Sequence, residues 1–181
     1  MGEVRVDIDA WDALVRPLGD HLLRSIARIV SQPEDAEDAL QDALATIWRK
    51  LQRIRAHQNP RALIFRICAD AAVDVLRRRR RFDRSKRPQL TSGNRPNPGG
   101  EAGNRLAAEE TRAEVRRAIA RLPRTQATAV VMRYVQEQDY RAIGDALGCR
   151  EATARAHVAR ARKRLSSLLA HLLATAGEAI R

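Results

Sequence analysis

The sequence predicts an all-α protein, and two patterns lead to this fold class. Apolar residues recur at intervals of three and four along most of the 181-residue chain, as they do on one face of a helix. Runs with the alternating β-branched and aromatic residues of a strand are missing. Hydrophobic residues make up 44% of the chain but aromatic residues only 3%, so we expect a helical core of Leu, Ile, Val and Ala.

Three helices are expected in the first half of the chain. The first covers about residues 9–30, and Pro17 kinks or restarts it. The second covers about residues 31–54, with Ser31 as its cap; its acidic beginning and basic end suit the helix dipole. The third starts at Asn59-Pro60 and ends in a run of arginines.

The composition changes after the third helix. Glycine and proline replace most apolar residues over residues 83–104, which predicts a flexible linker. Helices resume near Arg105, and we expect four of them, over about residues 105–121, 123–135, 139–147 and 151–174. The chain is therefore predicted to form two small helical domains, residues 1–82 and 105–181, joined by this linker.

The most specific local pattern lies in the last two of these helices. Gly148 follows the apolar end of a helix, where a residue with positive φ commonly closes it. The helix beyond is rich in arginine and places Ala154, Val158 and Leu165 on a buried stripe. This order of helix, turn and basic helix predicts a helix-turn-helix, whose second helix fits the major groove of duplex DNA.

Charge supports a nucleic-acid partner. Basic residues outnumber acidic residues by 34 to 22, which gives a formal net charge of +12. An excess of this size favours a polyanionic partner, usually nucleic acid. The alternative is an arginine-rich composition without such a partner, so the clustering of basic residues in the last third is the stronger indication.

The side chains that catalysis or metal binding would need are sparse. The two cysteines lack CxxC spacing and the four histidines lie far apart, so we expect no metal site and no cofactor. The sequence has no phosphate-binding GxxxxGK[ST] motif and no plausible nucleophile–base pair, so we expect no catalytic residues. Apolar runs fall short of the roughly 20 residues of a membrane helix, which predicts a cytoplasmic protein without membrane insertion.

Motifs in both halves, in order and joined by a linker, resemble bacterial RNA polymerase sigma factors of the extracytoplasmic function (ECF) group. In the first half, the resemblance lies in Pro33-Glu34-Asp35-Ala36-Glu37-Asp38, Trp48, Asn59-Pro60-Arg61-Ala62 and Asp74-Val75-Leu76-Arg77-Arg78. In the second half, it lies in Leu122-Pro123, Tyr140, Ile143, Ala146-Leu147-Gly148 and Arg160-Ala161-Arg162. The resemblance implies a non-catalytic protein that binds core RNA polymerase and directs promoter-specific transcription initiation.

The same resemblance implies roles for particular residues. Residues 1–82 would be sigma domain two, with an acidic patch against the β′ clamp helices of core polymerase formed by Glu34, Asp35, Glu37, Asp38, Gln41 and Asp42. An ordinary acidic start of a helix is the alternative explanation of this patch. Recognition and melting of the minus-10 promoter element would fall to His57, Gln58, Asn59, Arg61, Arg66, Asp70, Asp74, Arg77 and Arg78.

Residues 105–181 would be sigma domain four, which contacts the polymerase β flap and binds the minus-35 element as duplex DNA. Its DNA-binding residues would be Thr153, Arg155, His157, Arg160 and Lys163. An anti-sigma factor is a further partner that the resemblance implies. Two departures from the family pattern bear on promoter binding: Leu63 stands where Trp is frequent, and Asp70 where Asn is frequent.

Two other functions compete with this hypothesis. A stand-alone helix-turn-helix regulator would bind a palindrome as a dimer through its C-terminal half, but it would give the acidic patch no role. An enzyme is disfavoured because the chain lacks the catalytic motifs named above.

Overall fold

A computed structural model describes residues 2–85 and 101–172. Residues 1, 86–100 and 173–181, which include most of the predicted linker and the end of the last predicted helix, lie outside the described residues. All regular structure in the described ranges is helical, as predicted. The elements are α1 (Gly2–Leu14), η1 (Arg16–Leu18), α2 (Gly19–Ile29), α3 (Pro33–Arg49), α4 (Leu51–Arg55), α5 (Pro60–Ser85), α6 (Glu101–Ile119), α7 (Arg124–Tyr134), α8 (Tyr140–Leu147) and α9 (Glu151–Leu168).

The predicted first helix is two helices. Helix α1 begins at Gly2, well before the expected start, and the 3₁₀ turn η1 separates it from α2. Pro17 lies in that turn; because proline has no backbone N–H to donate, the α-helical hydrogen-bond ladder cannot run through it unbroken. The predicted interruption at Pro17 is therefore confirmed, whereas the first helix begins earlier than predicted.

The second predicted helix also differs in its caps and its end. Gln32, not Ser31, is the residue before α3, and its side chain makes no capping hydrogen bond. Lys50, with φ of −109° and ψ of 11°, leaves helical geometry and divides the predicted segment into α3 and α4. The acidic first turn of α3 was predicted correctly, and it is favourable there because the N-terminus of a helix is its positive end.

Helix α5 follows the predicted cap. The side-chain Oδ1 of Asn59 accepts a hydrogen bond of 3.1 Å from the backbone N–H of Ala62, so one otherwise unpaired donor of the first turn is satisfied. The helix runs to Ser85, and α6 already begins at Glu101, so both helices extend into the predicted linker. In α6, the hydrogen bond and charge of Arg116 lower the pKa of Glu109.

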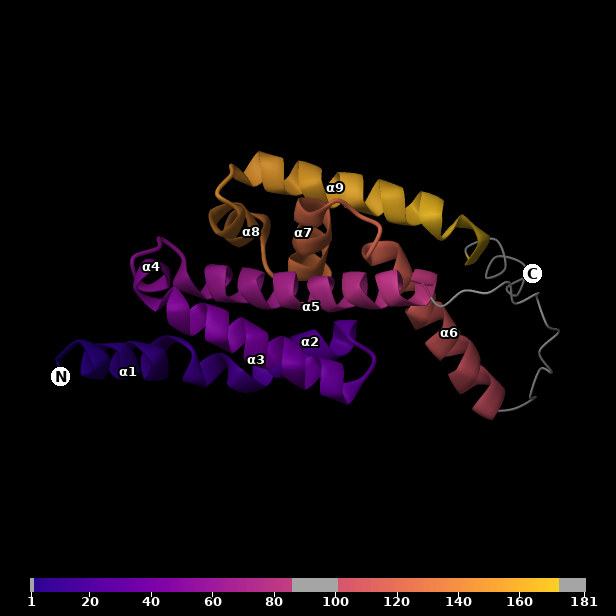
Figure 1. The fold of residues 1–181 in the computed structure, drawn as a ribbon. Coiled ribbons are helices and arrows are strands. Elements are labelled where there is room, and N and C mark those ends of the chain that lie inside the picture. Colours follow the sequence, from indigo (N-terminus) through magenta and orange to yellow (C-terminus); the bar gives the residue numbers. More distant parts are fainter. Residues whose placement is uncertain (1, 86–100, 173–181) are drawn as a thin grey trace.

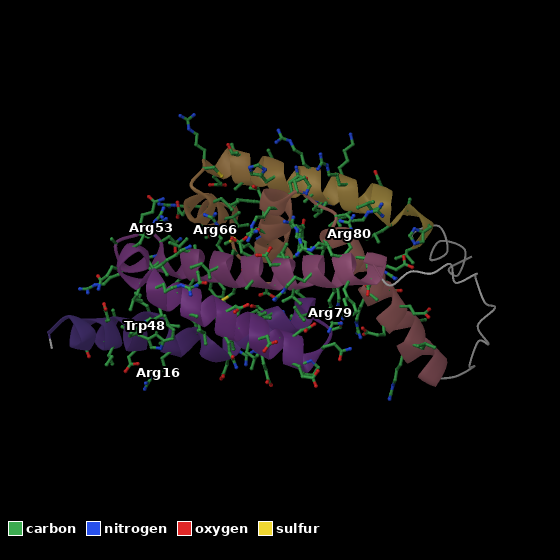
Figure 2. All side chains as sticks on the ribbon, viewed as in Figure 1. Arg16, Trp48, Arg53, Arg66, Arg79 and Arg80 are labelled. Atoms are coloured by element: carbon green, nitrogen blue, oxygen red, sulfur yellow. The ribbon has the colours of Figure 1, made fainter. Side chains whose placement is uncertain are left out.

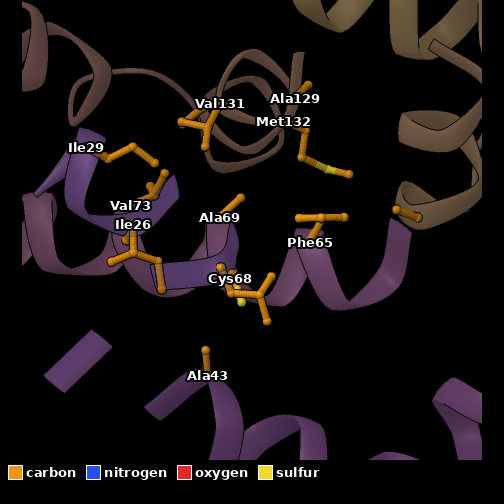
Figure 3. Packing of buried hydrophobic residues seen from close by; sticks show 14 of the residues in the cluster. Ile26, Ile29, Ala43, Phe65, Cys68, Ala69, Val73, Ala129, Val131 and Met132 are labelled. Carbon is orange, nitrogen blue, oxygen red and sulfur yellow. The ribbon is translucent and has the colours of Figure 1, made fainter. Parts of the chain in front are cut away.

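Helix α5 lies in the middle of the molecule. Helices α2 and α3 pack on one side of it, and α7, α8 and α9 lie on the other, with α9 outermost (Figure 1). A single cluster of buried residues includes side chains from both halves of the chain. In it, Met132, Val131 and Ala129 of α7 face Phe65 and Ala69 of α5 (Figure 3). The two predicted domains are therefore packed against each other.

The cysteines and tryptophans differ in how deeply they are buried. Cys68 is completely buried in α5, and burial raises the pKa of its thiol to about 12. Cys149 is half-buried, and both cysteines are free. Trp11 and Trp48 form an edge-to-face pair with ring centroids 5.4 Å apart, although Trp48 is 46% exposed.

Candidate nucleic-acid and polymerase interfaces

Helices α8 and α9 form the predicted helix-turn-helix. The Asp139 side chain caps α8 by accepting a 2.7 Å hydrogen bond from the N–H of Ala142. Gly148 closes α8 in the left-handed conformation, with φ of 70°, as expected. Arg150 precedes α9 and gives no side-chain cap.

A second glycine, which the sequence patterns did not single out, sets how closely the two helices approach. Gly144 is buried within α8, and a Cβ atom added there would lie 2.8 Å from the carbonyl oxygen of Cys149 and 3.3 Å from the N–H nitrogen of Glu151. Both atoms belong to the backbone, so a flexible side chain could not move away to make room. The turn therefore requires glycine at this position. In the sequence, the only sign of this close approach is a glycine inside an apolar helix.

Helix α9 presents its basic side chains on the outer surface of the molecule. Ala154 and Val158 are buried against the core, while Leu165 is half-buried beside it. Of the predicted DNA-binding residues, four are exposed and follow the outer side of the helix: Thr153, Arg155, Arg160 and Lys163. The fifth, His157, is half-buried, and its Nδ1 is buried without a hydrogen-bond partner among the described residues.

An aromatic ring positions the first arginine of this helix. The guanidinium carbon of Arg155 lies 4.3 Å from the centre of the Tyr140 ring, and that of Arg133 lies 4.9 Å from the same centre. Glu151 adds an ion pair of 2.8 Å to Arg155. These contacts limit the rotamers of a side chain at the N-terminal turn of α9, the part of a recognition helix that contacts base edges.

The predicted acidic patch lies on α3, on the side of α5 away from α9 (Figure 1). Five of its six side chains are exposed: Glu34, Glu37, Asp38, Gln41 and Asp42. The sixth, Asp35, is half-buried and hydrogen-bonds Arg79 of α5, while Asp42 lies 4.0 Å from Arg78. The patch is a continuous polar surface available to a large partner.

The predicted minus-10 residues lie in the loop before α5 and along α5, and most of them face the second half of the chain. Arg66 is between α5 and α8, and its guanidinium donates a 2.6 Å hydrogen bond to the Ala146 carbonyl (Figure 2). Arg77 donates to the Leu122 carbonyl at 2.8 Å. Asp74 pairs with Arg124 at 2.8 Å.

Three more of these residues make similar contacts. Asp70 accepts a 2.6 Å hydrogen bond from the hydroxyl of Thr128. Gln58 and Asn59 both donate to the carboxylate of Asp145, at 2.9 and 3.2 Å. His57 instead contacts Asn59 through its Nδ1. The exposed members of this set are Gln58, Arg61 and Arg78.

Beside these contacts, a groove of about 600 Å³ runs between α3 and α5. Its basic lining residues are Arg49, Lys50, Arg77, Arg78, Arg81 and Arg124. Within residues 2–85 and 101–172, no group of three His, Cys, Asp or Glu side chains could hold a metal ion. No helix in these ranges is both long and apolar enough to cross a membrane.

Comparison with known proteins places this geometry in a family. Residues 14–82 match the family described as Sigma-70 region 2, and residues 112–165 match the family described as Sigma-70, region 4. The ECF RNA polymerase sigma factor SigM of Mycobacterium tuberculosis is 34% identical over 164 residues, which cover 90% of this chain and 79% of SigM. The chain belongs to the ECF sigma factors.

Two further proteins are similar over most of this chain. The RNA polymerase sigma-H factor of Pseudomonas aeruginosa is 28% identical over 175 residues, covering 93% of this chain and 91% of that protein. The sigma factor RpoE of Bartonella quintana, in a co-crystal structure with the anti-sigma factor NepR, has a TM-score of 0.49 at 22% identity, covering 86% of this chain and 93% of RpoE.

As an ECF sigma factor, the chain binds core RNA polymerase and directs promoter-specific transcription initiation. Sigma factors are initiation factors rather than enzymes. The comparisons favour this function over a stand-alone regulator, because both sigma regions are present and in order.

Residues that join the two halves of this sigma factor were not predicted. They are Arg124, Thr128, Gln136, Asp145 and Ala146, which meet α5 or the loop before it. Arg124 contacts Asp74, which lies 50 positions earlier in the chain, and Asp145 contacts Asn59, which lies 86 positions earlier. No local pattern carries information about a contact between surfaces so distant in sequence.

Proposed function

We propose that three separate surfaces of this sigma factor bind core polymerase, the minus-10 element and the minus-35 element. Residues 1–82 act as sigma domain two and residues 105–181 as sigma domain four, with 83–104 between them. The acidic patch on α3 binds the β′ clamp helices of core polymerase, and domain four also contacts the β flap. The loop before α5 and α5 itself bind and melt the minus-10 element, and α9 binds the minus-35 element as duplex.

The observation that carries this proposal is the outward, basic face of α9, beyond a helix-turn-helix closed by Gly144 and Gly148. Arginine and lysine on such a face can contact phosphates and base edges in the major groove. An arginine that binds guanine through two hydrogen bonds discriminates by roughly 1–3 kcal/mol. Strand opening is driven by binding free energy, so the proposed mechanism has no catalytic step and no metal.

The assignment of α3 rests on its exposed carboxylates. A core-binding surface must remain accessible in the free protein, and five of the six patch residues are exposed. Opposite charges on a partner would accelerate association and select orientation. Reversing two of these charges therefore removes attraction and adds repulsion without disturbing a buried group.

The test is co-elution of the full chain with bacterial core RNA polymerase on size-exclusion chromatography. Asp38→Arg/Asp42→Arg should lose co-elution, while Asp9→Arg/Asp20→Arg, which changes two exposed carboxylates outside the patch by the same charge, should keep it. If both variants bind core like the unchanged chain, α3 is not the interface. If the unchanged chain fails to bind core and binds a palindromic duplex as a dimer, the stand-alone regulator replaces this function.

An anti-sigma factor is a further proposed partner, and it rests on family membership alone. The expected result is a second protein that co-purifies with the chain from its native source and prevents its binding to core polymerase. A chain that purifies alone and is fully active in transcription from its own promoters contradicts this part of the proposal.

A further inference from the structure

An arginine cavity of about 350 Å³ lies where the last turns of α5 meet the segment between α6 and α7. Its lining residues are Arg77, Arg80 and Arg81 of α5 and Ala120, Arg121 and Leu122 of that segment. Among the described residues, no aspartate or glutamate lines this cavity. Four guanidinium groups therefore surround a small volume that holds no carboxylate of the chain.

The lack of carboxylates distinguishes the arginine cavity from the larger groove between α3 and α5. The lining of that groove includes Asp42, Asp70 and Asp74 beside its basic residues. Asp74 already forms an ion pair of 2.8 Å with Arg124. The positive charges of the groove are thus partly neutralised by its own residues, whereas a ligand must supply the negative charge in the arginine cavity.

Backbone oxygens orient two of the four arginines. Arg77 donates a hydrogen bond of 2.8 Å to the carbonyl of Leu122, and Arg80 donates one of 3.2 Å to the carbonyl of Ala120. A carbonyl has no net charge, so these bonds hold the guanidinium groups in place without neutralising them. Because a guanidinium has five N–H donors, one such bond leaves donors that a ligand can use.

The other two arginines are exposed and come from different halves of the chain. Arg81 and Arg121 have no hydrogen-bond or ion-pair partner within the part of the chain that the structure describes. Positive charges that line one cavity repel each other, and an anion between them replaces repulsion by attraction. The planar fork of arginine binds phosphate oxygens through two parallel hydrogen bonds. Four such forks suit an anion with several charges close together, such as a chain of linked phosphates.

A second cavity, of about 480 Å³, adjoins the first one and is partly apolar. It shares Arg121 and Leu122 with the arginine cavity and extends along the end of α9 to Leu168. Leu122 is buried and Leu168 is half-buried, so the two leucines form an apolar wall beside the arginines. Ligand sites commonly combine an apolar wall with a few charged groups that fix orientation. Such a wall would hold the base of a nucleotide whose phosphates occupy the arginine cavity.

We infer that the arginine cavity binds a small molecule with linked phosphates, either an inorganic polyphosphate or the phosphate chain of a nucleotide. The inference does not rest on the proposed function, because Arg80, Arg81 and Arg121 belong to none of the proposed DNA-binding or polymerase-binding sets. Arg77 does belong to the minus-10 set. A bound ligand would therefore withhold this one side chain from promoter DNA.

The test is isothermal titration of the full chain, in buffer without magnesium, with sodium tripolyphosphate and with ATP. Sodium sulfate at the same ionic strength measures the general attraction of a basic protein for anions. Arg81→Ala/Arg121→Ala removes the two exposed arginines of the cavity. Arg24→Ala/Arg28→Ala, on the exposed side of α2, is the matched control because it removes the same charge elsewhere. A circular-dichroism melt establishes that each variant is folded.

The unchanged chain and the control variant should bind tripolyphosphate equally well, and sulfate should not bind measurably. Arg81→Ala/Arg121→Ala should bind tripolyphosphate at least ~10-fold more weakly, as expected when two charge-assisted contacts are lost. Equal affinities of the two variants, or binding of sulfate as tight as that of tripolyphosphate, would reduce the effect to general surface charge and overturn the inference.

The same titrations distinguish the two sources of phosphate. If the ligand is a nucleotide, ATP should bind more tightly than tripolyphosphate, and Leu168→Ala should weaken the binding of ATP alone. If the ligand is an inorganic polyphosphate, tripolyphosphate should bind at least as tightly as ATP, and Leu168→Ala should change neither affinity. In both cases the loss in Arg81→Ala/Arg121→Ala supports the phosphate site.

Discussion

Helices α5 and α9 are both rich in arginine, yet they differ in what surrounds those side chains. On α9, Arg155, Arg160 and Lys163 are exposed on the outer surface. On α5, Arg66 and Arg77 donate to carbonyls of the other half of the chain. Basic composition alone therefore does not identify a DNA-binding surface that is ready for use, because packing decides which charges are available.

The difference between α9 and α5 depends first on an intact helix-turn-helix, which alanine substitutions at two glycines can test. Gly144→Ala should destabilise the fold by about 2–3 kcal/mol, because its Cβ would lie 2.8 Å from a backbone oxygen. It should also abolish duplex binding while α3 still binds core polymerase. Gly19→Ala is the control: nothing lies within 4 Å of its Cβ and its φ is −47°, so no loss is expected. Thermal denaturation measures both; equal melting temperatures would contradict the proposed turn.

The buried side of α5 can be tested through Cys68. The pKa of its thiol is about 12 in the folded protein, above the ordinary value of 9.0, because burial disfavours the thiolate. The unfolded thiol therefore loses its proton first, so this contribution to stability is intact below pH 9 and declines as pH rises from 9 towards 12. Near pH 10.5, the loss should be about 2 kcal/mol.

Cys68→Ala supplies the reference for that measurement. Its overall stability is lower because it leaves a small cavity, but its free energy of unfolding should lack this alkaline decline. Denaturant unfolding of both proteins at several pH values gives the difference. Parallel pH profiles would show that Cys68 is not buried as described.

The outer face of α9 should carry most of the electrostatic affinity for duplex DNA. Arg160→Ala/Lys163→Ala should weaken duplex binding ~10-fold at low salt and lower the salt slope of the affinity by about 2. Arg24→Ala/Arg28→Ala, on the exposed side of α2, is the matched control and should have little effect. Anisotropy titrations over a range of salt concentrations decide this, and equal losses in both variants would remove the distinction between α9 and the rest of the surface.

The smallest expected effect concerns the positioning of Arg155. Tyr140→Ala removes the ring 4.3 Å from its guanidinium and should weaken duplex binding about two- to fivefold, as expected for an exposed cation–π contact of about 0.5–1 kcal/mol. Tyr140→Phe keeps the ring and should bind like the unchanged chain. Loss of affinity in Tyr140→Phe would mean that the hydroxyl, and not the stacking, matters.

Much of the fold and of α9 could be predicted from local patterns. A helix needs only its own apolar period and its end signals, so the positive φ of Gly148 and the Asn59 cap of α5 were both evident in the sequence. The errors at Ser31 and Lys50 were also local: they concern which residue caps a helix or where it stops, and neighbouring choices there differ little in energy.

The sequence by itself determined the helices, the basic face of α9, the acidic face of α3 and the likeness to sigma factors. Only the tertiary structure decided that Asp145, 86 positions from Asn59, meets that residue and that Arg124 meets Asp74. Periodicity tells which face of a helix is apolar or polar, but not which other face will cover it. That choice depends on the complementary shape and charge of surfaces that come together only when the chain is folded.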